Sequence, residues 1–150
     1  MYDNNQLMET YKSIKWEDSL SVGYVVIDGH HKKLVSLTEE LYSILSMPDP
    51  LYRLKIGKIL KRLSDYTVYH FQEEEKIMER YSYPALAEHA KIHASFVKKL
   101  NEALPLIATG NREVGMEMYG FLTKWLVEHI AGADHEWSKY IHETYPDEKF

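Results

Sequence analysis

The stretch YHFQEEEKIM, residues 69–78, combines a histidine with three consecutive glutamates. His70 and Glu74 are four residues apart, and side chains at this spacing project from the same face of an α-helix. The sequence before the stretch carries apolar residues at helical spacing, namely Leu54, Ile56, Ile59, Leu60, Leu63 and Tyr66. The pattern predicts a long helix over about residues 51–80, with the His70–Glu74 pair on the side that faces the core.

The rest of the chain predicts three more long helices and a short one, over about residues 28–46, 84–108, 112–131 and 134–143. Asp28 is the expected N-cap of the first helix. The segment MPDP (47–50) ends that helix, because a proline disfavours helical geometry in the residue before it. Pro84 is expected in the first turn of the third long helix, and Pro105 is expected to kink its last turn. The sequence TGN (109–111) is the expected turn before the fourth.

Long helices joined by short connections predict an all-α fold, an up-down-up-down antiparallel four-helix bundle. An irregular N-terminal arm precedes the bundle, and a short C-terminal helix follows it. The chain has no linker, repeat or low-complexity tract. We therefore expect residues 1–23 to form the arm and residues 24–150 to form a single bundle domain.

The composition narrows the classes of function. A chain of 150 residues with 45% hydrophobic and 27% charged residues is typical of one globular domain. A net charge of −5 and scattered lysines argue against a nucleic-acid-binding surface. The absence of cysteine excludes disulfides and thiolate metal sites. No signal-peptide pattern and no membrane-length apolar run are present, so the expected location is cytoplasmic, without membrane insertion.

Histidines on different helices are predicted to lie at one level of the bundle. In an antiparallel hairpin, residues equally distant from the turn lie side by side. The turn near Ser82 therefore sets His70 opposite His93. The same turn sets Glu74 opposite His89.

The other two turns bring two further histidines to this level. The turn near Gly110 places His129 between the two histidines of HAKIH (89–93). The turn at the MPDP segment places His31 within three residues of the level of His70, a distance of roughly 4.5 Å at the helical rise. A single histidine–glutamate pair is more often a solvated surface pair than a metal site. The convergence of four helices on one level reverses that preference.

In HIAGAD (129–134), Asp134 follows His129 by five residues, which is roughly 140° around a regular helix. Both side chains can reach one site only if the helix loosens between them, by a π-type turn or by ending. Gly132 would ease either change. We therefore predict a local irregularity in this segment and include Asp134 in the candidate site.

Five imidazoles and two carboxylates exceed the four ligands of a tetrahedral zinc ion. They suit two metal ions bridged by carboxylates, and nitrogen-rich coordination fits iron. The ferritin-like di-iron oxidases need a Glu-x-x-His motif on two helices, and no such motif occurs in this chain. The histidine-rich set points to reversible binding of O2 more than to its activation.

The chain resembles the hemerythrin family. The resemblance rests on IDGHHKKL (27–34), HFQEEEKIM (70–78), HAKIH (89–93) and WLVEHIAGAD (125–134), with Trp16 and Gly23 in the arm, and it covers about residues 16–140. It implies one iron held by His89, His93 and His129. It implies a second iron held by His31 and His70, with Glu74, Asp134 and an oxo or hydroxo group bridging the two ions. O2 is the implied ligand of the iron with two histidines.

The residues around the implied site are expected to have lesser roles. Trp125, Phe71 and Leu34 are candidates for the wall of a dry O2 pocket, although ordinary core packing is at least an equal alternative for each. The family usually has glutamine in place of His30, which we expect to be a surface residue more often than a ligand. Tyr66 is a weaker candidate for a hydrogen bond to a metal-binding histidine. Four further residues are expected to face solvent: Glu73, Glu75, His135 and His142.

Together these features predict a non-enzymatic protein that binds O2 reversibly at a non-haem di-iron centre, for O2 transport, storage or local supply. One alternative is a module that senses O2 or redox state through a contact with a protein partner, which the sequence does not identify. The other is a di-iron enzyme that handles peroxide or nitric oxide.

Overall fold

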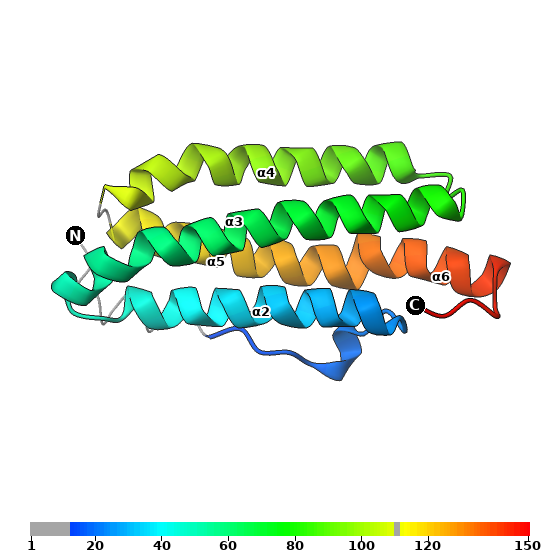
Figure 1. The fold of residues 1–150 in the computed structure, drawn as a ribbon, viewed down its shortest axis with the longest axis horizontal. Helices are drawn as coiled ribbons and strands as arrows, with labels where there is room; N and C mark the ends of the chain where they lie inside the picture. The colour runs from blue at the N-terminus through cyan, green and yellow to red at the C-terminus, as the bar shows by residue number, and fades with distance from the viewer. Residues whose placement is uncertain (1–12, 110–111) are drawn as a thin grey trace.

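The fold is a bundle of four long helices. The computed structural model describes residues 13–109 and 112–150 and contains the helices α2 (Val25–Leu45), α3 (Asp49–Arg80), α4 (Leu86–Ala108) and α5 (Arg112–His129). These helices run side by side along the long axis of the molecule (Figure 1). Contacts join α2 to α3, α3 to α4, α4 to α5 and α5 to α2. This closed ring of neighbours confirms the predicted all-α, antiparallel four-helix bundle.

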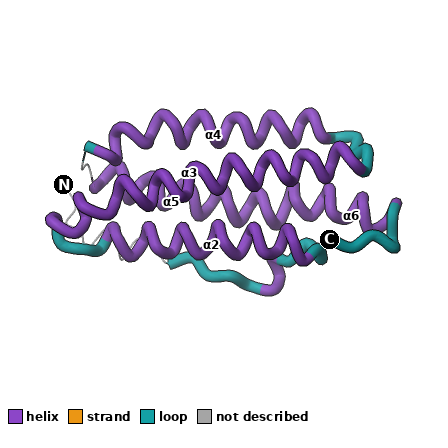
Figure 2. Tube along the Cα trace, viewed as in Figure 1, coloured by secondary structure: helices purple, strands orange, loops and turns teal. Residues whose placement is uncertain are grey.

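The bundle ends in a helix of changed geometry. After α5, the chain forms a π-helical segment, η2 (Ile130–Asp134), and continues directly into the short helix α6 (His135–Thr144). The described residues form only helices and loops (Figure 2). The π-helical segment confirms the irregularity that was predicted between His129 and Asp134.

The core consists of two apolar clusters on either side of one polar layer. The larger cluster fills most of the bundle and includes Leu34, Phe71 and Leu126. The smaller cluster lies toward the α6 end and is built around Tyr24 and Trp137, which are 1% and 0% exposed. On α2 and α4 the buried histidines lie in sequence between the two clusters. On α3 and α5 the polar layer overlaps the edge of the larger cluster, because Phe71 and Ile130 directly follow His70 and His129.

Two predicted helix starts are wrong by a few residues. Helix α2 begins at Val25, so Asp28 lies in its first turn instead of capping it. The Asp28 carboxylate reaches back to the extended chain before the helix, where it accepts hydrogen bonds from the Val22 N–H at 2.8 Å and from the Ser21 hydroxyl. Asp28 therefore still accepts a hydrogen bond from a backbone N–H near the helix start, but it does so from within the first turn.

Helix α4 begins at Leu86, two residues after Pro84, which was expected in its first turn. The turn is longer because Ser82 has a positive φ of 56°, and the Tyr83 N–H donates to the Met78 carbonyl at 2.9 Å to close the end of α3. Pro105 lies inside α4, which continues to Ala108. In the predicted turn 109–111, the last two residues lie outside the described part of the chain.

The described part of the predicted arm, residues 13–23, packs along the bundle. It contains one short 3₁₀ turn, η1 (Asp18–Leu20). Ile14 is buried, and its N–H donates to the Tyr119 hydroxyl at 3.0 Å. The division of the chain into an arm and a bundle domain stays a prediction, and residues 1–12 lie outside the described part. None of the described helices is both long and apolar enough to cross a membrane.

Arg112 joins the start of α5 to the connection between α2 and α3. Its guanidinium donates to the carbonyls of Leu45 and Met47 at 2.8 and 2.6 Å and to Asp49 at 2.6 Å. The same group lies 4.3 Å from the ring centroid of Tyr52. A carbonyl at a helix C-terminus lacks an intrahelical donor, so Arg112 supplies the hydrogen bond that the end of α2 needs.

We expect Arg112→Met to lower the free energy of unfolding by about 2–4 kcal/mol, because it removes several hydrogen bonds to a charged group and leaves the Leu45 carbonyl buried without a donor. Urea denaturation measures the change. Lys61→Met removes an exposed ion pair with Asp65 and should change stability by less than about 0.5 kcal/mol. Equal effects of the two substitutions would contradict the role of Arg112.

Candidate metal centre

The polar layer brings together all seven side chains that the sequence singled out as candidate ligands. One histidine comes from α2, a histidine and a glutamate from α3, two histidines from α4, one from α5, and the aspartate from η2. None of them is more than 7% exposed. They are His31, His70, Glu74, His89, His93, His129 and Asp134.

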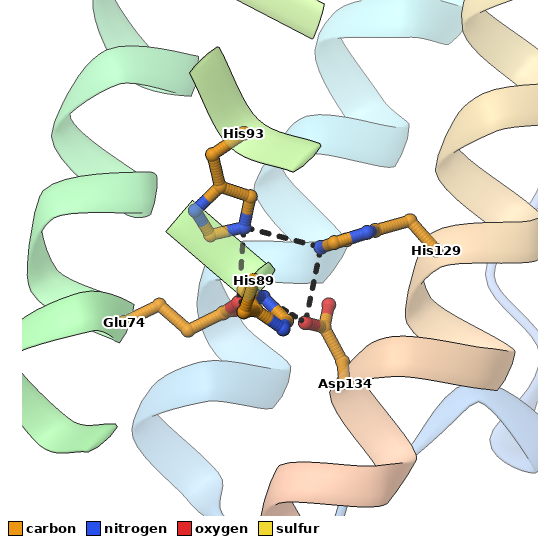
Figure 3. Close-up of side chains that lie close together, drawn as sticks. All are labelled: Glu74, His89, His93, His129 and Asp134. Atoms are coloured by element: carbon orange, nitrogen blue, oxygen red, sulfur yellow. Dashed lines mark hydrogen bonds and ion pairs between the residues drawn. The ribbon is translucent and has the colours of Figure 1, made fainter. Parts of the chain in front are cut away.

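The donor atoms form two groups that share both carboxylates. Within each group the candidate donor atoms lie within 4.8 Å of one another. The larger group, shown in Figure 3, joins Glu74 and Asp134 to the histidines of α4 and α5. The smaller group joins the same two carboxylates to His31 and His70. The structure therefore has the layout of two neighbouring cation sites with two shared acids, and the role of each residue as a ligand stays a prediction.

The π-helical segment is what lets His129 and Asp134 meet. In a regular helix, residues five apart point in different directions, roughly 140° apart. A π-helix links residues five apart through its hydrogen bonds and brings them toward one face. Nε2 of His129 consequently lies 3.2 Å from Oδ1 of Asp134. The indole N–H of Trp137, one turn later, donates to the same oxygen at 3.2 Å and holds the carboxylate.

Several buried donor atoms lack ordinary hydrogen-bond partners. Among the described residues, none forms a hydrogen bond of ordinary geometry with either nitrogen of His31, with Oε2 of Glu74 or with Oδ2 of Asp134. These atoms instead approach one another as close ion pairs, with Nε2 of His31 3.2 Å from Oδ2 of Asp134 and 3.5 Å from Oε2 of Glu74. Nε2 of His93 faces Nε2 of His129 at 3.1 Å. Buried polar atoms in proteins are normally paired. Nitrogen and oxygen donors that point at one another in a closed space fit the needs of bound cations.

The charges of the layer are strongly coupled. Burial lowers the pKa of His31, but the close carboxylates of Asp134 and Glu74 outweigh it and raise the pKa to about 9. The pKa of His89 is raised to about 9 by the same two carboxylates, again against the effect of burial.

The two carboxylates respond in the opposite direction. Burial raises their pKa, but the hydrogen bonds of the surrounding imidazoles, with the charge of His70 beside Glu74, hold the pKa of Glu74 and of Asp134 well below the usual range. Both acids are therefore ionised. In the metal-free protein, protonated imidazoles supply the positive charge that a metal would supply.

Three predictions about neighbouring residues are wrong, and two of them concern side chains that reach a candidate ligand. Glu75 was expected to face solvent, but its Oε2 lies 3.1 Å from Nδ1 of His93. His30 was expected at the surface, but it is only partly exposed and its Nδ1 lies 3.0 Å from Nδ1 of His70. Each of the two directly follows or precedes a candidate ligand in the sequence. Neighbours in a helix point about 100° apart, so such a residue can reach the outer nitrogen of a histidine on the next helix, which is the signal that could have found them.

The remaining residues near the layer differ in their exposure to solvent. His135 was expected at the surface, but it is partly buried and joins the Ile130 carbonyl, 2.6 Å from Nδ1, to the Ser21 carbonyl, 3.0 Å from Nε2. As expected, His142 is exposed. Glu73 pairs with the exposed Lys76 at 2.9 Å. Among the described residues, Tyr66 forms no hydrogen bond with a site histidine; its ring lies edge-on to that of His30, with centroids 6.0 Å apart.

Comparison with known proteins shows the family of the chain. The family model described as "Hemerythrin HHE cation binding domain" matches residues 22–141. The chain belongs to the hemerythrin family. It is 34% identical to a bacteriohemerythrin of Pseudomonas aeruginosa (strain LESB58) over 119 residues, which cover 79% of this chain and 75% of that protein. It is 31% identical to a bacteriohemerythrin of Clostridium acetobutylicum over 124 residues, 81% of this chain and 96% of that protein.

A hemerythrin-like protein shows a similar level of sequence identity. The chain is 31% identical to a hemerythrin-like protein of Naegleria gruberi over 119 residues, 79% of this chain and 86% of that protein. The matched hemerythrin region contains every residue of both donor groups. The family description and the clustered donors agree on a cation-binding site at this level of the bundle.

A small apolar hollow adjoins this layer in the hemerythrin bundle. Leu34, Phe71 and Trp125, the residues that were candidates for a pocket wall, all line it. Trp125 stacks on His129 with ring centroids 4.4 Å apart, and Phe71 stacks on His93 at 3.8 Å. The rings of Phe71 and Trp125 therefore stand between the hollow and these histidines. The role of the hollow as a ligand pocket stays a prediction.

The raised pKa values of His31 and His89 predict how the metal-free protein responds to pH. Each imidazolium stabilises the fold fully below the ordinary pKa of 6.5, and the contribution is lost as the pH rises toward about 9. The free energy of unfolding should fall across this interval by about 1.4 kcal/mol per pH unit for each proton that only the folded chain retains. Chemical denaturation of metal-free protein at several pH values measures the slope.

The metal-loaded protein is the control for this measurement. If the histidines bind a metal, they must already have lost their protons, so the decline should be absent. A free energy of unfolding that rises between pH 6.5 and 9 in the metal-free protein would contradict the charge pairing described above.

Proposed function

We propose that this protein binds O2 reversibly at a non-haem, carboxylate-bridged di-iron centre and serves in O2 transport, storage or local supply. The observation that carries the proposal is the inequality of the two donor groups. Both share Glu74 and Asp134, but one offers three histidines and the other offers only two. The group with fewer protein donors leaves more room for an external ligand.

The donor set suits iron. Imidazole nitrogens and carboxylate oxygens are good ligands for iron, and the chain contains no thiolate that would favour zinc or a sulfur cluster. His89, His93 and His129 would hold one ion, and His31 and His70 the other. When bound, two ferrous ions supply the two electrons that reversible binding of O2 requires.

The protein contributes a dry and proton-poor surrounding for that chemistry. Leu34 and Phe71 are 3% and 4% exposed and cover the histidine layer on the side of the apolar hollow. Two threonines also line the hollow, but Thr38 donates its hydroxyl proton to the Leu34 carbonyl at 2.8 Å, and Thr67 donates to the Leu63 carbonyl at 2.7 Å. Their protons are directed into the helices and away from the hollow. Such a wall keeps water out of the site. It also keeps away protons that would promote the release of bound O2 in a reduced form.

Titration of the anaerobically reduced protein with O2 tests the proposal. We expect two irons per chain by metal analysis and a visible absorption band that appears with O2 and disappears when O2 is removed. Irreversible oxidation, combined with steady-state turnover of added peroxide or nitric oxide, would replace the proposal with a di-iron enzyme. Binding of a partner protein that depends on O2 would favour a sensor.

Substitution of one histidine separates the two iron positions. We expect His70→Ala to lose the iron of the smaller group and to abolish the O2-dependent band, because that group would keep only one imidazole. His142→Ala is the matched control, since His142 is exposed and contacts the Val22 carbonyl instead of the polar layer. It should keep both irons and the band. Equal loss of iron in both variants would contradict the assignment of ligands.

A further inference from the structure

His30 lies outside the candidate ligand set but touches it. Its Nδ1 is 3.0 Å from Nδ1 of His70, and the two rings meet edge-on with centroids 5.1 Å apart. On its other sides His30 is flanked by Tyr66 and Tyr69, with ring centroids 6.0 and 5.6 Å away. His30 therefore lies between the buried layer and the surface, against the back of one candidate ligand.

The opposite nitrogen of His70 points into the layer. Its Nε2 lies 3.0 Å from Oε2 of Glu74, the carboxylate that both donor groups share. If Nε2 gives its lone pair to a metal, the proton of the neutral imidazole must reside on Nδ1. Nδ1 of His70 then donates, and Nδ1 of His30 must accept, with the proton of His30 on its own Nε2. This single arrangement of protons allows both the hydrogen bond between the two histidines and the binding of a metal by Nε2 of His70.

In the larger donor group, a carboxylate contacts the outer nitrogen of a candidate ligand, as His30 does in the smaller group. Nδ1 of His93 lies 3.1 Å from Oε2 of Glu75, while Nε2 of His93 points into the layer, 3.3 Å from Oε1 of Glu74. A carboxylate is a charged acceptor and forms the stronger hydrogen bond. His30 offers only a neutral imidazole nitrogen to the corresponding ligand of the smaller group.

The smaller group has no other support of this kind. The outer nitrogen of His31 is buried and has no hydrogen-bond partner in residues 13–109 and 112–150. His30 is consequently the hydrogen-bond partner on which the orientation of a histidine in that group depends. Without it, the ring of His70 could turn about its Cβ–Cγ bond and exchange the positions of Nδ1 and a carbon.

We propose that His30 is a positioning residue, which accepts a hydrogen bond from Nδ1 of His70 and thereby holds Nε2 of His70 toward the second metal. The inference rests on the di-metal site of the proposed function. It also implies an order of loading. The group with three histidines and a carboxylate support binds its metal first, and the group supported by His30 binds second and more weakly.

Anaerobic titration with Fe²⁺ against a competing chelator tests the role of His30. We expect His30→Leu, which cannot accept a hydrogen bond, to weaken the second binding step roughly 10-fold or more and to leave the first step unchanged. His30→Gln offers an amide oxygen in place of the imidazole nitrogen and should restore the second step to within about 3-fold of the wild type. Identical second-step affinity in His30→Leu and the wild type would overturn the inference.

A matched pair of glutamates checks the order of loading. Glu75→Gln should weaken the first step, because it replaces the charged acceptor behind His93 with a neutral one. Glu73→Gln makes the same chemical change two residues away, where the side chain pairs with Lys76, and should leave both steps unchanged. Equal weakening by both substitutions would mean that only the total charge matters and would overturn the assigned supports.

A spectroscopic measurement separates positioning from packing. In ¹⁵N-labelled protein loaded with Zn²⁺, which is diamagnetic, the His70 ring should show a proton on Nδ1 that exchanges slowly with solvent. The signal should be lost in His30→Leu and kept in His30→Gln. A lower unfolding midpoint of metal-free His30→Leu, with an unchanged His70 signal and normal Fe²⁺ binding, would assign His30 a packing role and overturn the inference.

The outcomes for the two proposals are distinct. If the wild type binds two Fe²⁺ ions and the substitutions at His30 have no effect, the positioning role fails and the di-iron centre stands. If the wild type binds fewer than two Fe²⁺ ions, both proposals fail.

Discussion

The structure depends on the burial of two ionised carboxylates inside a helical bundle. Glu74 and Asp134 are fully inaccessible to solvent, and their pKa values are held well below the usual range. A buried charge without a partner costs several kcal/mol, and removal of one member of a buried charged network leaves the others unpaired. The five imidazoles around the two acids are therefore a requirement of the fold as well as a candidate ligand set. The same atoms that would hold a metal hold the layer together when only protons are present.

The position of this layer explains how the bundle can tolerate it. Apolar clusters close it on both sides, with Leu34 and Phe71 in the larger cluster and Tyr24 and Trp137 in the smaller. Trp137 belongs to both environments, because its ring is buried in the smaller cluster and its indole N–H donates to Asp134. The apolar walls exclude water and strengthen the electrostatic contacts between them. Stability and the proposed function thus draw on the same arrangement.

A second set of contacts orients the layer from outside. Glu75 and His30 stand behind His93 and His70, and His135 ties the π-helical segment to the chain before α2 through the carbonyls of Ile130 and Ser21. These contacts connect the partly exposed surface of the protein to its most buried residues. These contacts differ between the two donor groups: a carboxylate, Glu75, stands behind a histidine of the larger group, and an imidazole, His30, stands behind a histidine of the smaller group. The difference matches the unequal number of histidines in the two donor groups.

The sequence by itself determined the helices, the bundle and the residues that meet at its polar level. Helical periodicity and short turns define the registers of the hairpins, and those registers set Glu74 opposite His89, whose Nε2 lies 2.8 Å from Oε1 of Glu74 in the structure. The spacing of His129 and Asp134 even required the helical irregularity that is present as η2. The helix starts near Asp28 and Pro84 were predicted wrongly from the sequence, because a helix can begin a few residues earlier or later at nearly equal free energy. Only the tertiary structure decided that His30, Glu75 and His135 turn toward the site, because that choice depends on the separation and rotation of helices, which a pattern of apolar residues does not specify.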